Sequence, residues 1–202
     1  MPLQAVTEEI IRRALGAINN RAYLPYIDPT RRSKLAPLLN GRGLDQVFRV
    51  PNNFLAVYAQ SHIGERNVKD KAKNVTAMTT ANQQDPEDRL IHFKNDPPEF
   101  GTVIHELFHW LSHKDFFAGF HASPGPNVGI VDEGITEFLT RKITAEDRTK
   151  HYQAEYLEVR QLSLGDPNVE ERFLQAYFKG DRENIRWLRE HVRAARRRGV
   201  RH

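Results

Sequence analysis

The sequence contains no cysteine among its 202 residues. This absence excludes every chemistry that needs the thiol: a cysteine nucleophile, an iron–sulfur cluster, a thiolate zinc finger and a disulfide scaffold. Any metal site in this chain must therefore use histidine and carboxylate ligands. With 39% hydrophobic and 9% aromatic residues, a chain of this length can bury a sizeable core without disulfide bonds.

The sequence also lacks a long apolar run. No segment approaches the roughly 20 apolar residues that a membrane-spanning helix needs. The start, Met1-Pro2-Leu3-Gln4, has no basic stretch followed by an apolar one, so no secretory signal peptide is visible. We therefore expect a protein without a membrane span, which is cytoplasmic or, if exported, is carried by a secretion apparatus.

Two common groups of catalytic motifs are missing as well. The chain has neither a P-loop nor G-x-G-x-x-G, which leaves nucleotide chemistry without support. It also lacks the G-x-S-x-G of serine hydrolases, because His121 stands where the stretch around Ser123 would need its first glycine.

Excess positive charge is confined to the C-terminal end. The formal net charge is +4, but residues 182–202 contain eight Arg and two Glu, so this segment carries +6 and the rest of the chain −2. Its arginines recur at helical spacing beside an apolar stripe of Ile185, Leu188 and Val192. We expect a docked amphipathic helix with a solvated arginine face. Nucleic-acid binding is disfavoured, because the aromatic or glycine interleaving of single-strand binders is absent.

The order of the predicted elements indicates an α+β fold. Residues 7–19 have the periodicity of a helix, and the Pro-rich stretch 96–98 separates short β-like segments from longer helical ones. The predicted strands are 46–50, 54–60, 75–80 and 89–93, and the later predicted helices are 100–113, 130–143, 145–164, 169–178 and 183–195. We expect a small N-terminal mixed β-sheet packed on the helix at 100–113, followed by a mainly helical C-terminal half.

We expect these elements to form a single domain. Its parts would be an N-terminal helix and sheet subdomain (1–98), a helical subdomain (99–180) and a basic C-terminal helix or tail (181–202). Residues 123–127, which contain two prolines and a glycine, are expected to form a loop.

One short motif carries metal chemistry. Residues 105–109 read His-Glu-Leu-Phe-His, the H-E-x-x-H pattern of zinc metallopeptidases. Side chains four apart on a helix differ by about 40° in direction and by one turn in height, so the imidazoles of His105 and His109 can reach one ion. Glu106 points about 100° further round, where a base acting on a water molecule should sit. The motif lies among apolar residues, where two His and a Glu are costly without a partner.

A hydrolytic zinc site needs a third protein ligand and an open position for water. The metzincin spacing fails at positions 112 and 115. His113 continues the series of four, but three successive turns converge poorly on one ion. Glu133, on the next predicted helix, is the better candidate, and Glu137 follows it by one turn on the same face. His92, within a predicted strand, is a weaker alternative.

Together, H-E-x-x-H and the downstream Glu133-Gly134-Ile135-Thr136-Glu137 resemble the gluzincin metallopeptidases, the thermolysin-like group. The resemblance implies a zincin-like fold and one Zn²⁺ ion held by His105, His109 and Glu133. It also implies that Glu106 is the general base and that Glu137 orients a ligand histidine. The expected function is that of a zinc-dependent metalloendopeptidase, which hydrolyses a peptide or protein substrate with a zinc-activated water.

Gluzincins also supply a tyrosine or histidine from their C-terminal helical part to stabilise the oxyanion. The candidates here are Tyr152, Tyr156, His151 and Tyr177. We favour Tyr152, followed by Tyr156. Substrate strands in this group pair with an exposed sheet edge, and residues 74–80 are the expected edge.

Residues 89–140, with the later stretch 176–181, also resemble compact metallopeptidase toxin domains of bacterial polymorphic toxins and type VI secretion effectors. This second resemblance implies an effector delivered by a secretion system, with a carrier or spike domain and an immunity protein as partners. The alternatives are a housekeeping cytosolic metallopeptidase and a non-catalytic zinc-stabilised binding module. The least favoured hypothesis is a basic nucleic-acid-binding protein.

Overall fold

A computed structural model describes residues 3–20, 23–61, 74–81, 85, 87–120, 128–144, 148, 151–163 and 168–199; for 128–130, 163 and 192–199 it describes the backbone alone. The predicted loop at 123–127 lies outside these residues. The chain divides into two compact units. The first comprises Met1–Asn20 and Ser33–Trp110, and the second Arg21–Arg32 and Leu111–His202.

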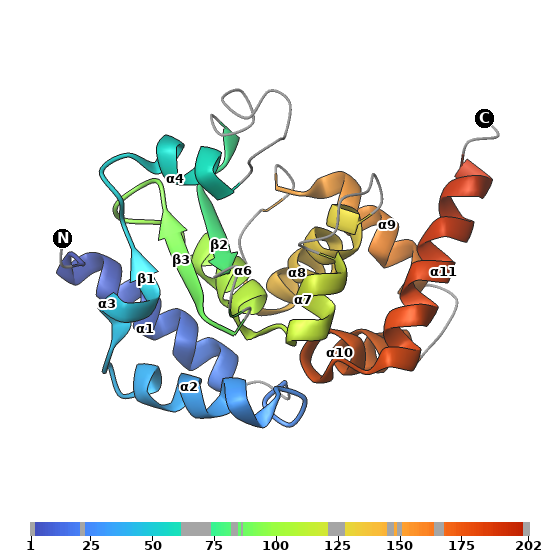
Figure 1. The fold of residues 1–202 in the computed structure, drawn as a ribbon, viewed down its shortest axis with the longest axis horizontal. Helices are drawn as coiled ribbons and strands as arrows, with labels where there is room; N and C mark the ends of the chain where they lie inside the picture. The colour runs from blue at the N-terminus through green and yellow to red at the C-terminus, as the bar shows by residue number, and fades with distance from the viewer. Residues whose placement is uncertain are drawn as a thin grey trace. The chain divides into compact units, whose positions relative to one another are not determined.

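The helices and strands follow one another along the chain as shown in Figure 1. In order they are α1 (Ala5–Asn19), α2 (Pro29–Leu39), α3 (Leu44–Val47), β1 (Phe48–Arg49), α4 (Phe54–Ser61), β2 (Ala77–Ala81), β3 (Arg89–Phe93), α6 (Phe100–Leu111), α7 (Lys114–Phe120), α8 (Val128–Ile143), α9 (Gln153–Ser163), α10 (Val169–Lys179) and α11 (Arg182–Gly199).

The described part of the first unit contains a small mixed sheet with the strand order β1-β3-β2. The central strand β3 pairs with β1 in parallel and with β2 in antiparallel orientation. Ile91 and Phe93 of β3 are fully buried, and the ring of Phe93 stacks on Phe48 of β1. The predicted α+β class and the small mixed sheet are thus confirmed. Strand β2 is an edge strand, as predicted for residues 74–80.

Helix α6 packs against this sheet and runs in the opposite direction to β3. At its C-terminal end the indole of Trp110 donates to the carbonyl of Arg89, at the start of β3 (3.1 Å). The Arg89 guanidinium in turn donates to the carbonyl of His109 (2.7 Å). The apolar side chains that mark the predicted helix, Val103, Ile104, Leu107, Phe108 and Leu111, are all fully buried. The motif helix is therefore part of the protein core.

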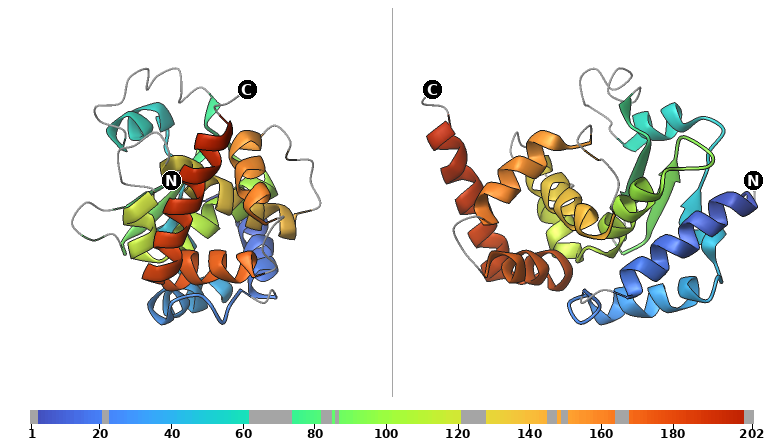
Figure 2. Two further views of the ribbon diagram at one scale, coloured as in Figure 1. Left: turned by 90° about the vertical axis from the view of Figure 1, so that its right-hand side faces the viewer. Right: turned by 180° about the vertical axis from the view of Figure 1, so that it is seen from behind.

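Helix α1 lies on the same face of the sheet as α6, as Figure 1 and the rear view in Figure 2 show. The Thr7 hydroxyl donates a hydrogen bond to Asp96, in the segment between β3 and α6. The Arg13 guanidinium lies 5.2 Å from the centre of the Phe100 ring, at the first turn of α6. Helix α1 thus fixes the start of the motif helix.

The described residues of the second unit contain helices and no strand. Its core is aromatic: Phe116 of α7 packs against Tyr177 of α10 (4.7 Å between ring centres), and Tyr177 packs against Phe178. The Tyr177 hydroxyl shares a 2.7 Å hydrogen bond with the Thr136 hydroxyl of α8. This bond ties the second motif helix to α10 and satisfies both buried polar groups.

Helix α11 has the amphipathic character predicted for residues 183–195. Ile185 and Leu188 are buried, whereas Arg182, Arg186 and Arg189 are exposed. The arginine face is therefore solvated over the part whose side chains are described. No helix in the described part of the chain has the length and apolar character needed to cross a bilayer.

One predicted strand is wrong, and a second is confirmed only in part. Residues 54–60 form helix α4 and not a strand, because Phe54 and Tyr58, one helical turn apart, both pack into a small cluster with Met78. The Asn53 side chain also accepts a hydrogen bond from the Ala56 amide (3.1 Å), a helix N-cap that favours this outcome. In place of the strand at 46–50, the structure has the short helix α3 followed by the two-residue strand β1.

The predicted helix at 145–164 is shorter than expected and begins only at Gln153. Tyr152, the residue before it, has a positive φ of 46°, a left-handed conformation that a continuous helix cannot contain. Helices α2 and α7 were not predicted from the sequence. The other predicted helices, and the strands at 75–80 and 89–93, are confirmed with shifts of a few residues at most.

Candidate metal centre

Helix α6 brings His105 and His109 together, as the four-residue spacing predicts. Both side chains are only 2% exposed. Their Nε2 atoms lie 3.1 Å apart, and the two rings meet edge to face, with 4.8 Å between their centres. A tetrahedral zinc about 2.0–2.1 Å from two nitrogens would separate them by about 3.3 Å. The distance therefore suits either a hydrogen bond between the imidazoles or two nitrogens that share an ion.

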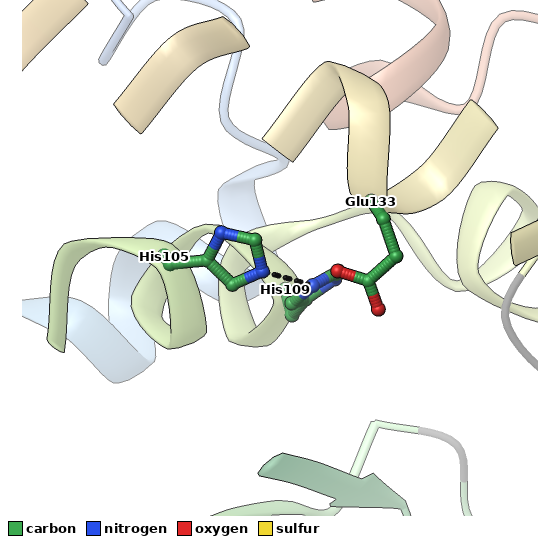
Figure 3. Close-up of side chains that lie close together, drawn as sticks. All are labelled: His105, His109 and Glu133. Carbon is green, nitrogen blue, oxygen red and sulfur yellow. Dashed lines mark hydrogen bonds between the residues drawn. The ribbon is translucent and has the colours of Figure 1, made fainter. Parts of the chain in front are cut away.

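Glu133 of α8 completes the group. Figure 3 shows its carboxylate facing the His109 ring. One ligand atom from each of His105, His109 and Glu133 can be chosen so that all three lie within 4.8 Å of one another. Two imidazoles and one carboxylate are a donor set typical of hydrolytic zinc sites. The buried histidine pair and Glu133 could therefore hold a metal ion, and the candidate ligands fit the predicted zinc.

Glu106, next to His105 on α6, is buried and lies within hydrogen-bonding distance of a side chain of the sheet. Its side chain is 4% exposed. The hydroxyl of Thr79, on β2, lies 2.8 Å from the Glu106 Oε2 atom and 3.1 Å from the Glu106 main-chain carbonyl oxygen. Thr79 was not predicted from the sequence. Between Ala77 and Ala81 it is the polar residue on one face of β2, but the sequence does not show that this face lies against Glu106.

Glu137 is fully buried and binds two arginines. Its carboxylate accepts hydrogen bonds from Arg141 Nε (2.8 Å) and from Arg148 Nε (3.0 Å) and a terminal nitrogen of Arg148 (3.0 Å). Arg141 also donates to the main-chain carbonyls of Arg148 and His151. The network thus joins α8 to the segment that precedes α9. That Glu137 orients a ligand histidine stays a prediction.

The two candidate oxyanion donors lie at the start of α9. Tyr152 is the residue with the left-handed backbone, and Tyr156 lies one turn into the helix. The Arg141 guanidinium lies 3.9 Å from the centre of the Tyr156 ring, and Phe138 stacks on the same ring. The Glu137 network therefore also fixes Tyr156, whose catalytic role, like that of Tyr152, stays a prediction.

The start of α9 comes close to the ligand helix because residue 134 is a glycine. A Cβ atom added at Gly134 would lie 2.6 Å from the main-chain carbonyl oxygen of Glu155 and 2.5 Å from a Val159 methyl group. Any larger residue would force the two helices apart. Gly134 directly follows Glu133, so this contact sets the position of α9 beside a candidate metal ligand.

We therefore predict that Gly134→Ala destabilises the protein by about 1–3 kcal/mol, the typical cost of overpacking a core, although alanine is the better helix former. Gly16→Ala in α1 is the matched control: nothing lies within 4 Å of its added Cβ, so it should stabilise by about 0.5–1 kcal/mol. Urea denaturation of both variants measures the difference. Equal or greater stability of Gly134→Ala would show that the helices separate without cost.

The two alternative histidine ligands, His113 and His92, bond residues outside the candidate metal group. The His113 ring lies where a Cβ of Gly180 would be, and its Nδ1 accepts a hydrogen bond from the Asp115 amide. His92, on β3, is 8% exposed, and its Nε2 shares a 3.0 Å hydrogen bond with the Thr80 hydroxyl. Neither is part of the group formed by His105, His109 and Glu133.

Burial lowers the pKa of His92 from 6.5 to about 4, with a smaller contribution from the positive charge of Arg49. His92 is therefore neutral in the folded protein, whereas in the unfolded chain it takes up a proton below pH 6.5. The contribution of neutral His92 to the free energy of unfolding is complete above pH 6.5 and is lost as the pH falls from there to about 4.

We expect the free energy of unfolding to fall between pH 7 and pH 4.5 in both the metal-free wild type and metal-free His92→Gln. The fall should be about 2 kcal/mol larger in the wild type. Urea denaturation of both proteins across this range provides the measurement. Parallel stability curves would mean that His92 titrates alike in the folded and unfolded states.

Comparison with protein-family models, curated proteins and solved structures finds no match to this chain.

Proposed function

We propose that this protein is a zinc-dependent metalloendopeptidase of the gluzincin type with a zincin-like arrangement. The observation that carries the proposal is the proximity of His105, His109 and Glu133, whose candidate ligand atoms lie within 4.8 Å of one another. These residues come from two motifs that are more than twenty positions apart in the sequence. In this proposal His105, His109 and Glu133 hold the ion, and Glu106 stands beside it.

A bound Zn²⁺ would supply Lewis acidity, which polarises a carbonyl group and makes a water molecule more acidic. The remaining steps belong to the chain's own residues. Glu106 accepts a proton from the attacking water through its carboxylate and then gives that proton to the nitrogen of the leaving amine. The proton balance closes within one cycle, because Glu106 returns to its ionised form.

Burial supports this role for Glu106. Glu106 is 4% exposed and its α6 neighbours Val103 and Leu107 are fully buried, and charge interactions are stronger in such surroundings than in water. The absence of cysteine and of a serine nucleophile motif agrees with a mechanism without a covalent intermediate. Tyr152 and Tyr156 are the proposed oxyanion donors, and delivery as a secreted effector stays a prediction from the toxin-domain resemblance.

The experiment is to prepare the metal-free protein, add one equivalent of zinc and follow the cleavage of a quenched peptide library. We expect one zinc per chain by elemental analysis, hydrolysis only in the loaded form, loss of activity with phenanthroline and its return with added zinc. Hydrolysis that survives complete metal removal would reject the proposal. Zinc-dependent stability without any hydrolysis would favour the non-catalytic zinc-stabilised module.

A further inference from the structure

The Thr79 hydroxyl is placed to control the carboxylate of Glu106. Thr79 is 4% exposed, and its main chain is paired with Ile91 in the β2–β3 ladder. A threonine side chain is stiff at χ1 because it is branched at Cβ. Strand pairing and side-chain stiffness together fix the hydroxyl relative to the sheet, which packs directly on α6.

We propose that Thr79 is a positioning residue: its hydroxyl holds the Oε2 atom of Glu106 and leaves Oε1 to accept the proton of the attacking water. This inference rests on the proposed function, in which Glu106 is the general base. The 2.8 Å distance from the Thr79 hydroxyl to Oε2 is that of a normal hydrogen bond to a carboxylate. A hydrogen bond to a charged group is stronger than one between neutral groups.

The second acceptor near Thr79 gives the hydroxyl a partner throughout the reaction. A threonine hydroxyl has one proton, and the Glu106 carbonyl oxygen lies 3.1 Å away. While Glu106 is ionised, the proton favours the charged carboxylate. Once Glu106 has taken up a proton from the water, the hydroxyl can turn to the carbonyl oxygen. The Thr79 hydroxyl thus has an acceptor both when Glu106 is ionised and when it is protonated. It takes no part in the proton transfer itself.

The consequence is kinetic. A glutamate side chain has three rotatable bonds, and a base that is misplaced by about 1 Å can lose about 100-fold in rate. Removal of the Thr79 hydroxyl should therefore lower kcat and leave KM and metal content unchanged, because the hydroxyl bonds Glu106 and the substitution keeps the main chain of β2, through which a substrate strand would pair.

The first experiment measures the coupling of Thr79 and Glu106 in the metal-free protein and needs no activity. Thr79→Val, Glu106→Ala and the double variant are unfolded with urea. Loss of a hydrogen bond to a charged group should make Thr79→Val raise the unfolding equilibrium constant about 10- to 100-fold more in the presence of Glu106 than in its absence. Equal effects in the two backgrounds would overturn the proposal. If Thr79→Val does not fold, Thr79→Ala replaces it.

The second experiment is kinetic and uses the zinc-loaded protein. We expect Thr79→Val to lower kcat about 10- to 100-fold with unchanged KM, and Thr79→Ser, which keeps the hydroxyl, to stay within about threefold of the wild type. Thr140→Val is the matched control, because it removes a buried hydroxyl that bonds a main-chain carbonyl of α8 and has no part in the site.

The outcomes separate the two proposals. A kcat of Thr79→Val within twofold of the wild type, or a Thr79→Ser variant as slow as Thr79→Val, would overturn the positioning role. If the loaded wild type cleaves no peptide, the proposed peptidase function fails, and the coupling in the metal-free protein still decides whether the Thr79 hydroxyl holds Glu106.

Discussion

Glu106→Gln should reduce peptide hydrolysis by about 100- to 10,000-fold, the usual contribution of a general base, and leave the zinc in place. An amide of nearly the same shape cannot accept the proton of the attacking water. It can still accept the hydrogen bond from Thr79, because its oxygen can take the position of Oε2, 2.8 Å from the hydroxyl. The variant thus separates the chemistry of the carboxylate from its packing.

Two measurements check this expectation: the rate of cleavage of a quenched peptide and the zinc content by elemental analysis. Glu99→Gln, at an exposed position just before α6, is the control and should retain full activity. Loss of zinc from Glu106→Gln would make Glu106 a ligand. A rate within tenfold of the wild type would assign the proton transfer to another group.

The parts of the site that the sequence predicts are those that depend on helical spacing. His105, Glu106 and His109 lie on one continuous apolar helix, so their relative positions follow from 3.6 residues per turn. Glu133 was proposed as the third ligand from the downstream motif, and the structure brings it to the histidines. Local periodicity succeeded here because packing and helix propensity favour the same conformation.

The remaining parts depend on contacts between segments distant in the sequence. Arg148 binds Glu137 across eleven positions, Thr79 reaches Glu106 across twenty-seven, and Gly134 is needed only because α9 packs on it. Helix α4 was mistaken for a strand because Phe54–Ser61 is rich in apolar and aromatic residues. Its packing on Met78 and the Asn53 cap together favour the helix. Tertiary packing overrides local propensity at such places.

The local backbone at Tyr152 has a similar origin. The sequence around it is compatible with a helix, yet its φ is 46°. The carbonyls of Arg148 and His151 accept hydrogen bonds from Arg141, and these bonds compete with the helical ones. A buried ion-pair network thus sets where α9 begins, and with it the position of both candidate oxyanion donors.

Glu133→Ala should lower the zinc affinity by more than about 100-fold, because even residues that only support a ligand contribute 10- to 100-fold. It removes the one carboxylate of the candidate donor set and leaves His105 and His109, whose Nε2 atoms lie 3.1 Å apart. Competition with a chromophoric zinc chelator measures the affinity. Glu170→Gln is the control. This partly exposed carboxylate forms a surface ion pair with Lys142, so its substitution should leave the zinc affinity unchanged.

The same substitution should remove most of the stability that zinc confers. An ion that binds only the folded state stabilises it by about 2.7 kcal/mol when its free concentration is 100 times Kd. At that zinc concentration the wild type should melt several degrees higher than the metal-free protein, whereas Glu133→Ala should gain little, because its Kd has risen to the zinc concentration or above. Thermal melts with and without zinc test this directly. If Glu133→Ala keeps both the wild-type affinity and the full thermal shift, Glu133 is not a ligand, and the gluzincin assignment fails with it.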